Sequence, residues 1–138
     1  MKWIGVDLDG TLAYFDKKKP HVIGEPIKPM LNFVKEIIDN DDYEVRIFTA
    51  RAGDAFSMGQ VRSWLNQQGL YGLTITNEKD GDMHAIFDDK AMRVEFNTGK
   101  ICTCCLKADK DPKNMHSNML STVNTYGVSD PQQFLTDC

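Results

Sequence analysis

The chain has no long hydrophobic run. No apolar stretch approaches the roughly 20 residues that a membrane-spanning helix needs, and the apolar N-terminal stretch contains Asp7 and Asp9, which a signal peptide would not. We therefore expect a cytoplasmic protein that does not contact a membrane. Positive charge is not in excess either: the formal net charge of −4 argues against tight, non-specific binding to nucleic acid, which depends on neutralising phosphates. This net charge does not exclude a local basic patch.

Cysteine is absent from the first hundred residues. The four cysteines are Cys102, Cys104, Cys105 and Cys138, and the only histidine downstream of the first three is His116. C-x-C-C is not the spacing of a zinc knuckle. In a cytoplasmic chain we expect these side chains to be reduced thiols. The alternative is a zinc-stabilised interaction module built from His116 and the first three cysteines.

The composition is that of an ordinary folded domain. Of 138 residues, 41% are hydrophobic and 26% are charged, so the chain is long enough to bury a core without staples. The patterning weakens after Leu106, where A-D-K-D-P-K-N resembles a linker. We predict a core domain over residues 1–106 and an appendage over residues 107–138.

Short apolar strands alternate with amphipathic helices along the core. Pro29 suits a first helical turn and Asp54 suits an N-cap. This alternation predicts an α/β fold with a parallel sheet and right-handed crossovers. The expected elements are a strand from Trp3, a loop over 12–27, helices over 29–40 and 54–68, strands over 43–48, 73–76 and 83–87, a hairpin over 94–103, and a short helix over 115–123.

The stretch W-I-G-V-D-L-D-G-T-L is the most informative one. The apolar run reads as a buried strand, and Gly10 allows the chain to turn sharply at its end. Asp7 and Asp9 therefore emerge at the carboxyl end of a strand, where open α/β sheets bind ligands. Carboxylates this close repel, and a hard cation such as Mg²⁺ relieves the repulsion. The alternative is a capped turn in which Asp9 and Thr11 bond local N–H groups.

Three further strand ends carry suitable chemistry. Thr49 follows the second strand, Lys79 precedes the fourth, and Asp88 and Asp89 follow the fourth. Each residue taken alone has an ordinary structural explanation. Because parallel strands bring their carboxyl ends to one edge, we expect all of these groups to converge there.

These four positions resemble the motif series of the haloacid-dehalogenase-like phosphohydrolases. That series runs D-x-D-G-T, then Thr or Ser, then Lys, then an acidic pair, and "IFTAR", "TNEKD" and "IFDDKAM" are similar to it in small members. The resemblance covers roughly residues 1–100 and implies a three-layer, doubly wound sheet. Lys90 stands where many relatives have Arg. The gaps that hold a lid domain in relatives are too short here, which implies an open, capless site.

The resemblance also implies roles for the acids. Asp7 would be the nucleophile that forms an aspartyl-phosphate. Asp9 would protonate the departing oxygen and then activate water. Mg²⁺ would bind Asp7, the backbone carbonyl of Asp9, and Asp88. Asp89 would bind the metal through water or orient Lys79, and the sequence does not rank these.

The phosphoryl oxygens would be held by Thr49, Lys79 and the backbone N–H groups of Leu8 and Gly10. Arg51 could reach the substrate or pair with an acid, and the two readings weigh equally. The run Lys17–Lys19 reads first as a solvated loop and second as an attractor for polyanionic substrates.

The function predicted from the sequence is a Mg²⁺-dependent phosphatase. Its substrate would be a phosphomonoester of a nucleotide, an oligonucleotide end or another small metabolite. The alternative is a catalytically silent module of the same fold that binds metal or a phosphorylated ligand. A signalling receiver domain is disfavoured, because its phospho-accepting Asp ends the third strand, where this chain has Thr76 and Asn77.

Overall fold

The computed structural model describes residues 1–102, 104–105 and 135–136. The predicted appendage helix over 115–123, His116 and Cys138 therefore lie outside the described residues. The chain divides into two units, Met1–Asp89 and Lys90–Cys138. This division falls earlier than the sequence-based boundary after residue 106, because the hairpin that follows β4 belongs to the second unit.

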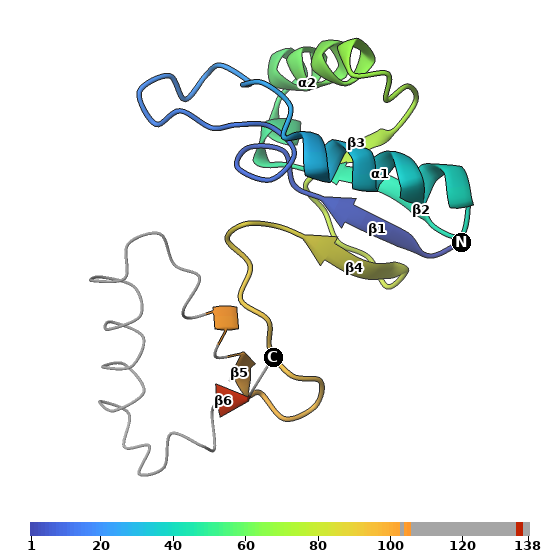
Figure 1. The fold of residues 1–138 in the computed structure, drawn as a ribbon, viewed down its shortest axis with the longest axis vertical. Helices are drawn as coiled ribbons and strands as arrows, with labels where there is room; N and C mark the ends of the chain where they lie inside the picture. Colours follow the sequence, from blue (N-terminus) through green and yellow to red (C-terminus); the bar gives the residue numbers. More distant parts are fainter. Residues whose placement is uncertain (103, 106–134, 137–138) are drawn as a thin grey trace. The chain divides into compact units, whose positions relative to one another are not determined.

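A four-stranded parallel sheet forms the first unit (Figure 1). Its strands are β1 (Trp3–Val6), β2 (Glu44–Phe48), β3 (Thr74–Thr76) and β4 (Met83–Phe87), in the spatial order β3-β2-β1-β4. The parallel pairing in register (Ile4 opposite Val45 and Ala85) brings the carboxyl ends of the strands to one edge. The predicted α/β class with a parallel sheet is confirmed.

Two helices cover one face of this sheet. Helix α1 (Lys28–Asn40) links β1 to β2, and the 3₁₀ turn η1 (Ala50–Gly53) with helix α2 (Ala55–Gln67) links β2 to β3. Both crossovers step in the same direction, so right-handed connections place both helices on the same face. The core mixes alternate strand residues with helix residues, among them Val6, Ile47, Val34, Val61 and Leu65.

The opposite face of the sheet is crossed by a short connection. Residues 77–82 lead from β3 to β4 without a helix. Trp3 is fully buried there: its Nε1 donates to Asp80 Oδ1 at 2.7 Å, and the Arg46 guanidinium stacks 4.6 Å from its ring. Within the described residues no helix covers this face, so the three-layer arrangement stays a prediction.

The helix ends follow their sequence signals. Asp54 caps α2, its side chain accepting from the Ser57 N–H at 2.8 Å, as predicted. Pro29 lies in the first turn of α1, which ends at Asp41 in the left-handed region with φ 54°. Strand β1 ends at Val6, directly before Asp7, which agrees with the prediction that Asp7 emerges at the carboxyl end of this strand.

The second unit contains the predicted hairpin. Val94 pairs antiparallel with Ile101, and the Glu95 N–H donates to the Lys100 carbonyl at 2.8 Å. Strand β5 (Ile101–Cys102) pairs parallel with β6 (Leu135–Thr136). Cys104 and Cys105 are reduced thiols, as expected, whereas Cys102 is disulfide-bonded, which corrects the expectation of a reduced thiol there. Among the described residues, no group suited to a metal ion includes a cysteine.

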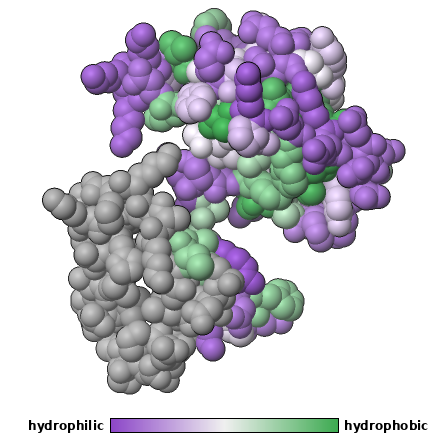
Figure 2. Space-filling model, viewed as in Figure 1, coloured by the Kyte–Doolittle hydropathy of each residue, from purple (hydrophilic) through white to green (hydrophobic). Residues whose placement is uncertain are grey.

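No helix in the described part of the chain is both long enough and apolar enough to cross a membrane. Hydrophilic side chains cover the projecting end of the segment between β1 and α1, drawn in blue in Figure 1 and seen in the same view in Figure 2.

Candidate active site

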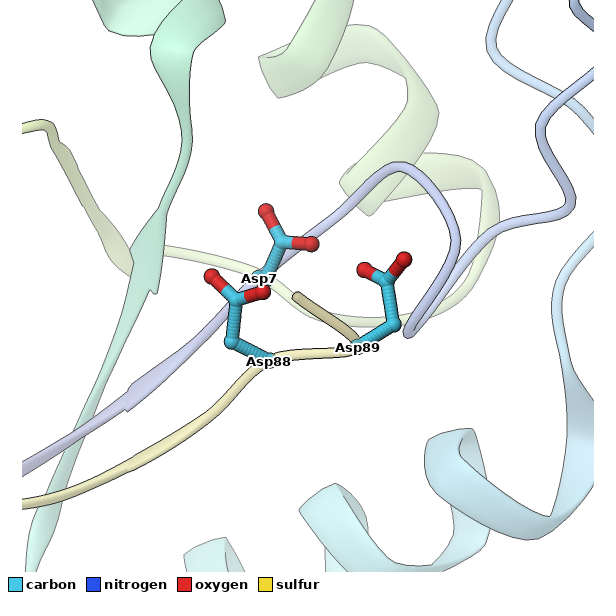
Figure 3. A group of neighbouring side chains, drawn as sticks. All are labelled: Asp7, Asp88 and Asp89. Carbon is cyan, nitrogen blue, oxygen red and sulfur yellow. The ribbon is translucent and has the colours of Figure 1, made fainter. Parts of the chain in front are cut away.

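Three carboxylates converge at the carboxyl edge of the sheet (Figure 3). They belong to Asp7, directly after β1, and to Asp88 and Asp89, directly after β4; one oxygen of each lies within 4.8 Å of the others. The Asp7 N–H donates to the Phe87 carbonyl at 2.9 Å, so the β1–β4 pairing continues right up to these residues. We call them the Asp7–Asp88–Asp89 cluster. The sequence predicted this convergence.

The carboxylates of the cluster repel one another, and a bound cation would relieve this repulsion. Burial, a hydrogen bond with Asp89 and the repulsion of Asp88 raise the pKa of Asp7 to about 7, and the Thr11 hydroxyl only partly offsets them. In an octahedral Mg²⁺ site with metal–oxygen distances of about 2.1 Å, ligand oxygens stand about 3 to 4 Å apart. One oxygen of each carboxylate lies within 4.8 Å of the others, a limit close to this spacing. Carboxylate oxygens are also the ligands that a hard cation prefers, so the chemistry of these three residues is compatible with a magnesium ion.

Thr11 connects the ends of β1 and β4. The sequence analysis did not name it among the site residues. Its hydroxyl lies 3.2 Å from Asp7 Oδ2 and 3.1 Å from Asp89 Oδ1, and it accepts from the Asp89 N–H at 3.0 Å. Thr11 is buried. The signal that could have identified it is its place in D-x-D-G-T, where a hydroxyl follows two acids at a tight turn.

The turn after Asp7 is closed by backbone bonds. The Leu8 carbonyl accepts from the N–H groups of Thr11, Leu12 and Ala13 at 2.9–3.2 Å, and Gly10 has φ +89°. A Cβ atom on Gly10 would lie 2.8 Å from Asp89 Oδ2, so only glycine fits against this carboxylate.

The two predicted backbone donors differ. The Gly10 N–H already donates to the Ala13 carbonyl at 2.8 Å, which leaves it unsuited to a phosphate as the turn stands. The Leu8 N–H has no acceptor within the described residues, so it stays available for an anion.

Asp9 points to a different partner. Its carboxylate receives two bonds from Arg51, Nε to Oδ2 at 2.7 Å and Nη2 to Oδ1 at 3.0 Å. The side chains are 23% and 13% exposed, so the pair is largely shielded from water. The carboxylate of Asp9 is therefore outside the Asp7–Asp88–Asp89 cluster, and of the two readings of Arg51 the structure favours pairing with an acid.

Thr49 lies at the same edge, at the end of β2. It is 3% exposed, its N–H donates to the Thr76 carbonyl at 2.9 Å, and its hydroxyl oxygen accepts from the Arg51 N–H at 3.2 Å. The hydroxyl proton is left for another acceptor. Thr49 thus occupies the position that the sequence predicted for a phosphate-binding hydroxyl.

Lys79 lies in the connection between β3 and β4. It is exposed and makes no hydrogen bond or ion pair within the part of the chain that the structure describes. Its neighbour Asp80 is bound by Trp3, the first residue of β1, at the far end of that strand from Asp7. Directly after Lys79, the β3–β4 connection is therefore held against the first residue of β1 through Asp80.

An open hollow of about 440 Å³ lies beside the cluster. Asp88, Asp89, Gly10 and Thr11 line it on the acidic side, and Ile27, Pro29, Met30 and Phe87 line it on the apolar side. The site is thus accessible from solvent, as expected for a chain without a lid insertion.

No protein-family model, curated protein or solved structure matches this chain. What the site does must therefore be argued from its own geometry.

Proposed function

We propose that this protein is a Mg²⁺-dependent phosphomonoesterase that works through an aspartyl-phosphate. One observation carries the proposal: Asp7, Asp88 and Asp89, chosen from the sequence as members of one site, bring their carboxylates within 4.8 Å of one another. The motif resemblance to haloacid-dehalogenase-like phosphohydrolases, with its three-layer fold, is part of this proposal.

In the proposed reaction Asp7 attacks the phosphorus. The bond from Asp7 to phosphorus forms as the bond to the leaving oxygen breaks, and Asp9 supplies that oxygen with a proton. Water then attacks the phosphorus, the carboxylate of Asp7 departs with its electron pair, and the proton of the water goes to Asp9. Splitting the displacement in two avoids a direct attack of water on a dianion.

Asp7, Asp88 and the backbone carbonyl of Asp9 would hold the magnesium ion. When bound, it neutralises charge on the phosphoryl oxygens and on the carboxylates around them. Thr49 and the Leu8 N–H would bind phosphoryl oxygens, and Asp89 stays close enough to act through a bound water. Lys79, which is exposed, would bind a phosphoryl oxygen only once a substrate is present.

The open hollow suits the leaving group. Its apolar lining by Ile27, Met30 and Phe87 could receive the organic part of a nucleotide, an oligonucleotide end or another small metabolite. With no lid to add contacts, we expect modest discrimination among small phosphomonoesters.

Phosphate release from p-nitrophenyl phosphate and a panel of nucleotides, sugar phosphates and phosphorylated oligonucleotides tests the proposal. Turnover should require Mg²⁺, stop with a chelator, and disappear in Asp7→Asn. Full activity in Asp7→Asn would remove Asp7 as the nucleophile.

The second candidate is a catalytically silent module that binds a metal or a phosphorylated ligand. Lys79 favours it, because this residue makes no hydrogen bond or ion pair with the cluster within the described residues. Mg²⁺ binding without turnover of any phosphomonoester in the panel would select this candidate.

A further inference from the structure

Arg51 joins two parts of the molecule that are distant in sequence. Besides the two bonds to Asp9, its Nη2 donates to the Pro20 carbonyl at 3.1 Å and its Nη1 to the His21 carbonyl at 3.3 Å. A guanidinium presents its N–H groups in one rigid plane. Arg51 therefore binds two groups at once: Asp9 at the carboxyl edge of the sheet, and the carbonyls of Pro20 and His21 in the loop between β1 and α1.

That segment, residues 14–26, we call the β1–α1 arm. Its base is closed by the Tyr14 N–H, which donates to the Glu25 carbonyl at 2.9 Å, and by the pairing of Ala13 with Pro26. A second anchor is Trp64 of α2, whose Nε1 donates to the Gly24 carbonyl at 2.9 Å. Arg51 therefore holds the outer part of the arm, and Trp64 holds the part nearer its base.

We infer that Arg51 is a positioning residue for Asp9 in the second half of the proposed reaction. The inference rests on the proposed function. A carboxylate offers about four lone-pair positions; Arg51 occupies two of them and fixes the plane of the carboxylate. The remaining positions are held in one orientation, ready to accept the proton of the attacking water. The backbone carbonyls of the arm keep the guanidinium itself from turning away.

The ion pair favours this half-reaction over the first. Arg51 binds both oxygens of Asp9, and this fixed orientation counts most in the step in which Asp9 must accept a proton from a water molecule. Arg51 should therefore matter most when water cleaves the bond between phosphorus and Asp7. With p-nitrophenyl phosphate the leaving group departs easily without a proton, so the loss of Arg51 should slow the hydrolysis step far more than the first step and make hydrolysis rate-limiting in the variant.

The experiment compares Arg51→Gln with the wild type on p-nitrophenyl phosphate. We expect kcat to fall about 10²-fold, and KM to fall with it, so that kcat/KM changes less than about fivefold. Rapid mixing should show a burst of p-nitrophenol close to one equivalent per protein, as phosphorylated Asp7 accumulates. A purely structural loss would lower the active fraction without a burst and without lowering KM.

Two further variants complete the test. Trp64→Phe removes the other anchor of the arm without touching Asp9, and it should keep kcat within about threefold and show no burst. Arg51→Lys retains the charge but cannot bind both oxygens and both carbonyls, so its kcat should lie between those of Arg51→Gln and the wild type. Thermal melts establish that each variant is folded.

The outcomes separate the two levels of the argument. A wild type that turns over no phosphomonoester refutes the proposed function, and the inference with it. A wild type that is active beside an Arg51→Gln with unchanged kcat refutes the inference alone. The same kinetic change in Trp64→Phe also overturns it, because the effect would then belong to the arm and not to Asp9.

Discussion

The carboxyl edge of the sheet holds two groups of acids that differ in one respect. Asp9 has its own cation, Arg51, at 2.7 Å, whereas Asp7, Asp88 and Asp89 face one another and the pKa of Asp7 rises to about 7. The fold thus pairs Asp9 with a cation of its own, whereas repulsion within the cluster contributes to the raised pKa of Asp7. The comparison supports the proposal that the Asp7–Asp88–Asp89 cluster, and not the Asp9 carboxylate, would receive an external ion.

Replacing Asp7 should have the largest effect. Asp7→Asn removes the nucleophile, so we expect Mg²⁺-dependent turnover to fall by about 10⁴-fold or more. Phosphate release under saturating p-nitrophenyl phosphate measures this. Asp39→Asn, an exposed acid on α1, is the matched control and should keep activity within about twofold.

Magnesium should stabilise the protein through the cluster and not through Asp9. At a Mg²⁺ concentration about one hundred times Kd, binding adds about 2.7 kcal/mol to the free energy of unfolding. Urea melts with Mg²⁺ and with a chelator measure this gain. It should be largely lost in Asp88→Asn and retained in Arg51→Gln. An equal gain in Asp88→Asn would mean that the ion binds elsewhere.

Without metal, the protein should lose stability as the pH rises. Asp7 keeps its proton in the folded protein up to about pH 7, against an ordinary pKa of 3.8 in the unfolded chain. Between these values the folded state binds more protons, so the contribution of Asp7 to stability is full below the lower value and is lost as the pH rises towards 7. Urea melts from about pH 4.5 to about pH 7.5 measure the trend.

Asp7→Asn provides the comparison for that series, since it cannot titrate. Its stability should vary less with pH than that of the wild type, and it should exceed the wild type near neutral pH. Parallel curves for the two proteins would contradict the raised pKa of Asp7.

Removing the hydroxyl of Thr11 should have the smallest effect of the four. Thr11→Val loses the contacts with Asp7 and Asp89, so we expect a cost of about 1–2 kcal/mol in the free energy of unfolding. Thr11→Ser keeps the hydroxyl and should recover most of this cost. Urea melts of both variants measure it, and a Thr11→Val variant as stable as the wild type would contradict a stabilising role for the hydroxyl.

The sequence predicted that residues following different strands share the carboxyl edge of the sheet. It was less informative about the hydrogen bonds and ion pairs that these residues form there. Asp7, Thr49 and Asp88 each follow a strand, and parallel strands end together, so their meeting needed only the order of the elements. Helix α2 was likewise marked by Asp54 at its cap. These features depend on local pattern and on the handedness of crossovers, and both can be read from one sequence.

The partners of Arg51 could not be predicted from the sequence in this way. The pair with Asp9 joins residues 42 positions apart, and the carbonyls of Pro20 and His21 accept through backbone atoms that carry no side-chain signal. The surroundings of Lys79 could not be predicted for a related reason: its neighbour Asp80 is bound by Trp3, a contact that the spacing of Lys79 from any strand does not reveal.

The tight turn from Leu8 to Ala13 has a consequence for ion affinity. Three N–H groups converge on the Leu8 carbonyl, and Gly10 sits against Asp89 with no room for a side chain. The loop therefore already has a single shape before any ligand arrives, and binding an ion would cost little further chain entropy. The repulsion among the carboxylates, relieved by the ion, then becomes a net gain in binding free energy.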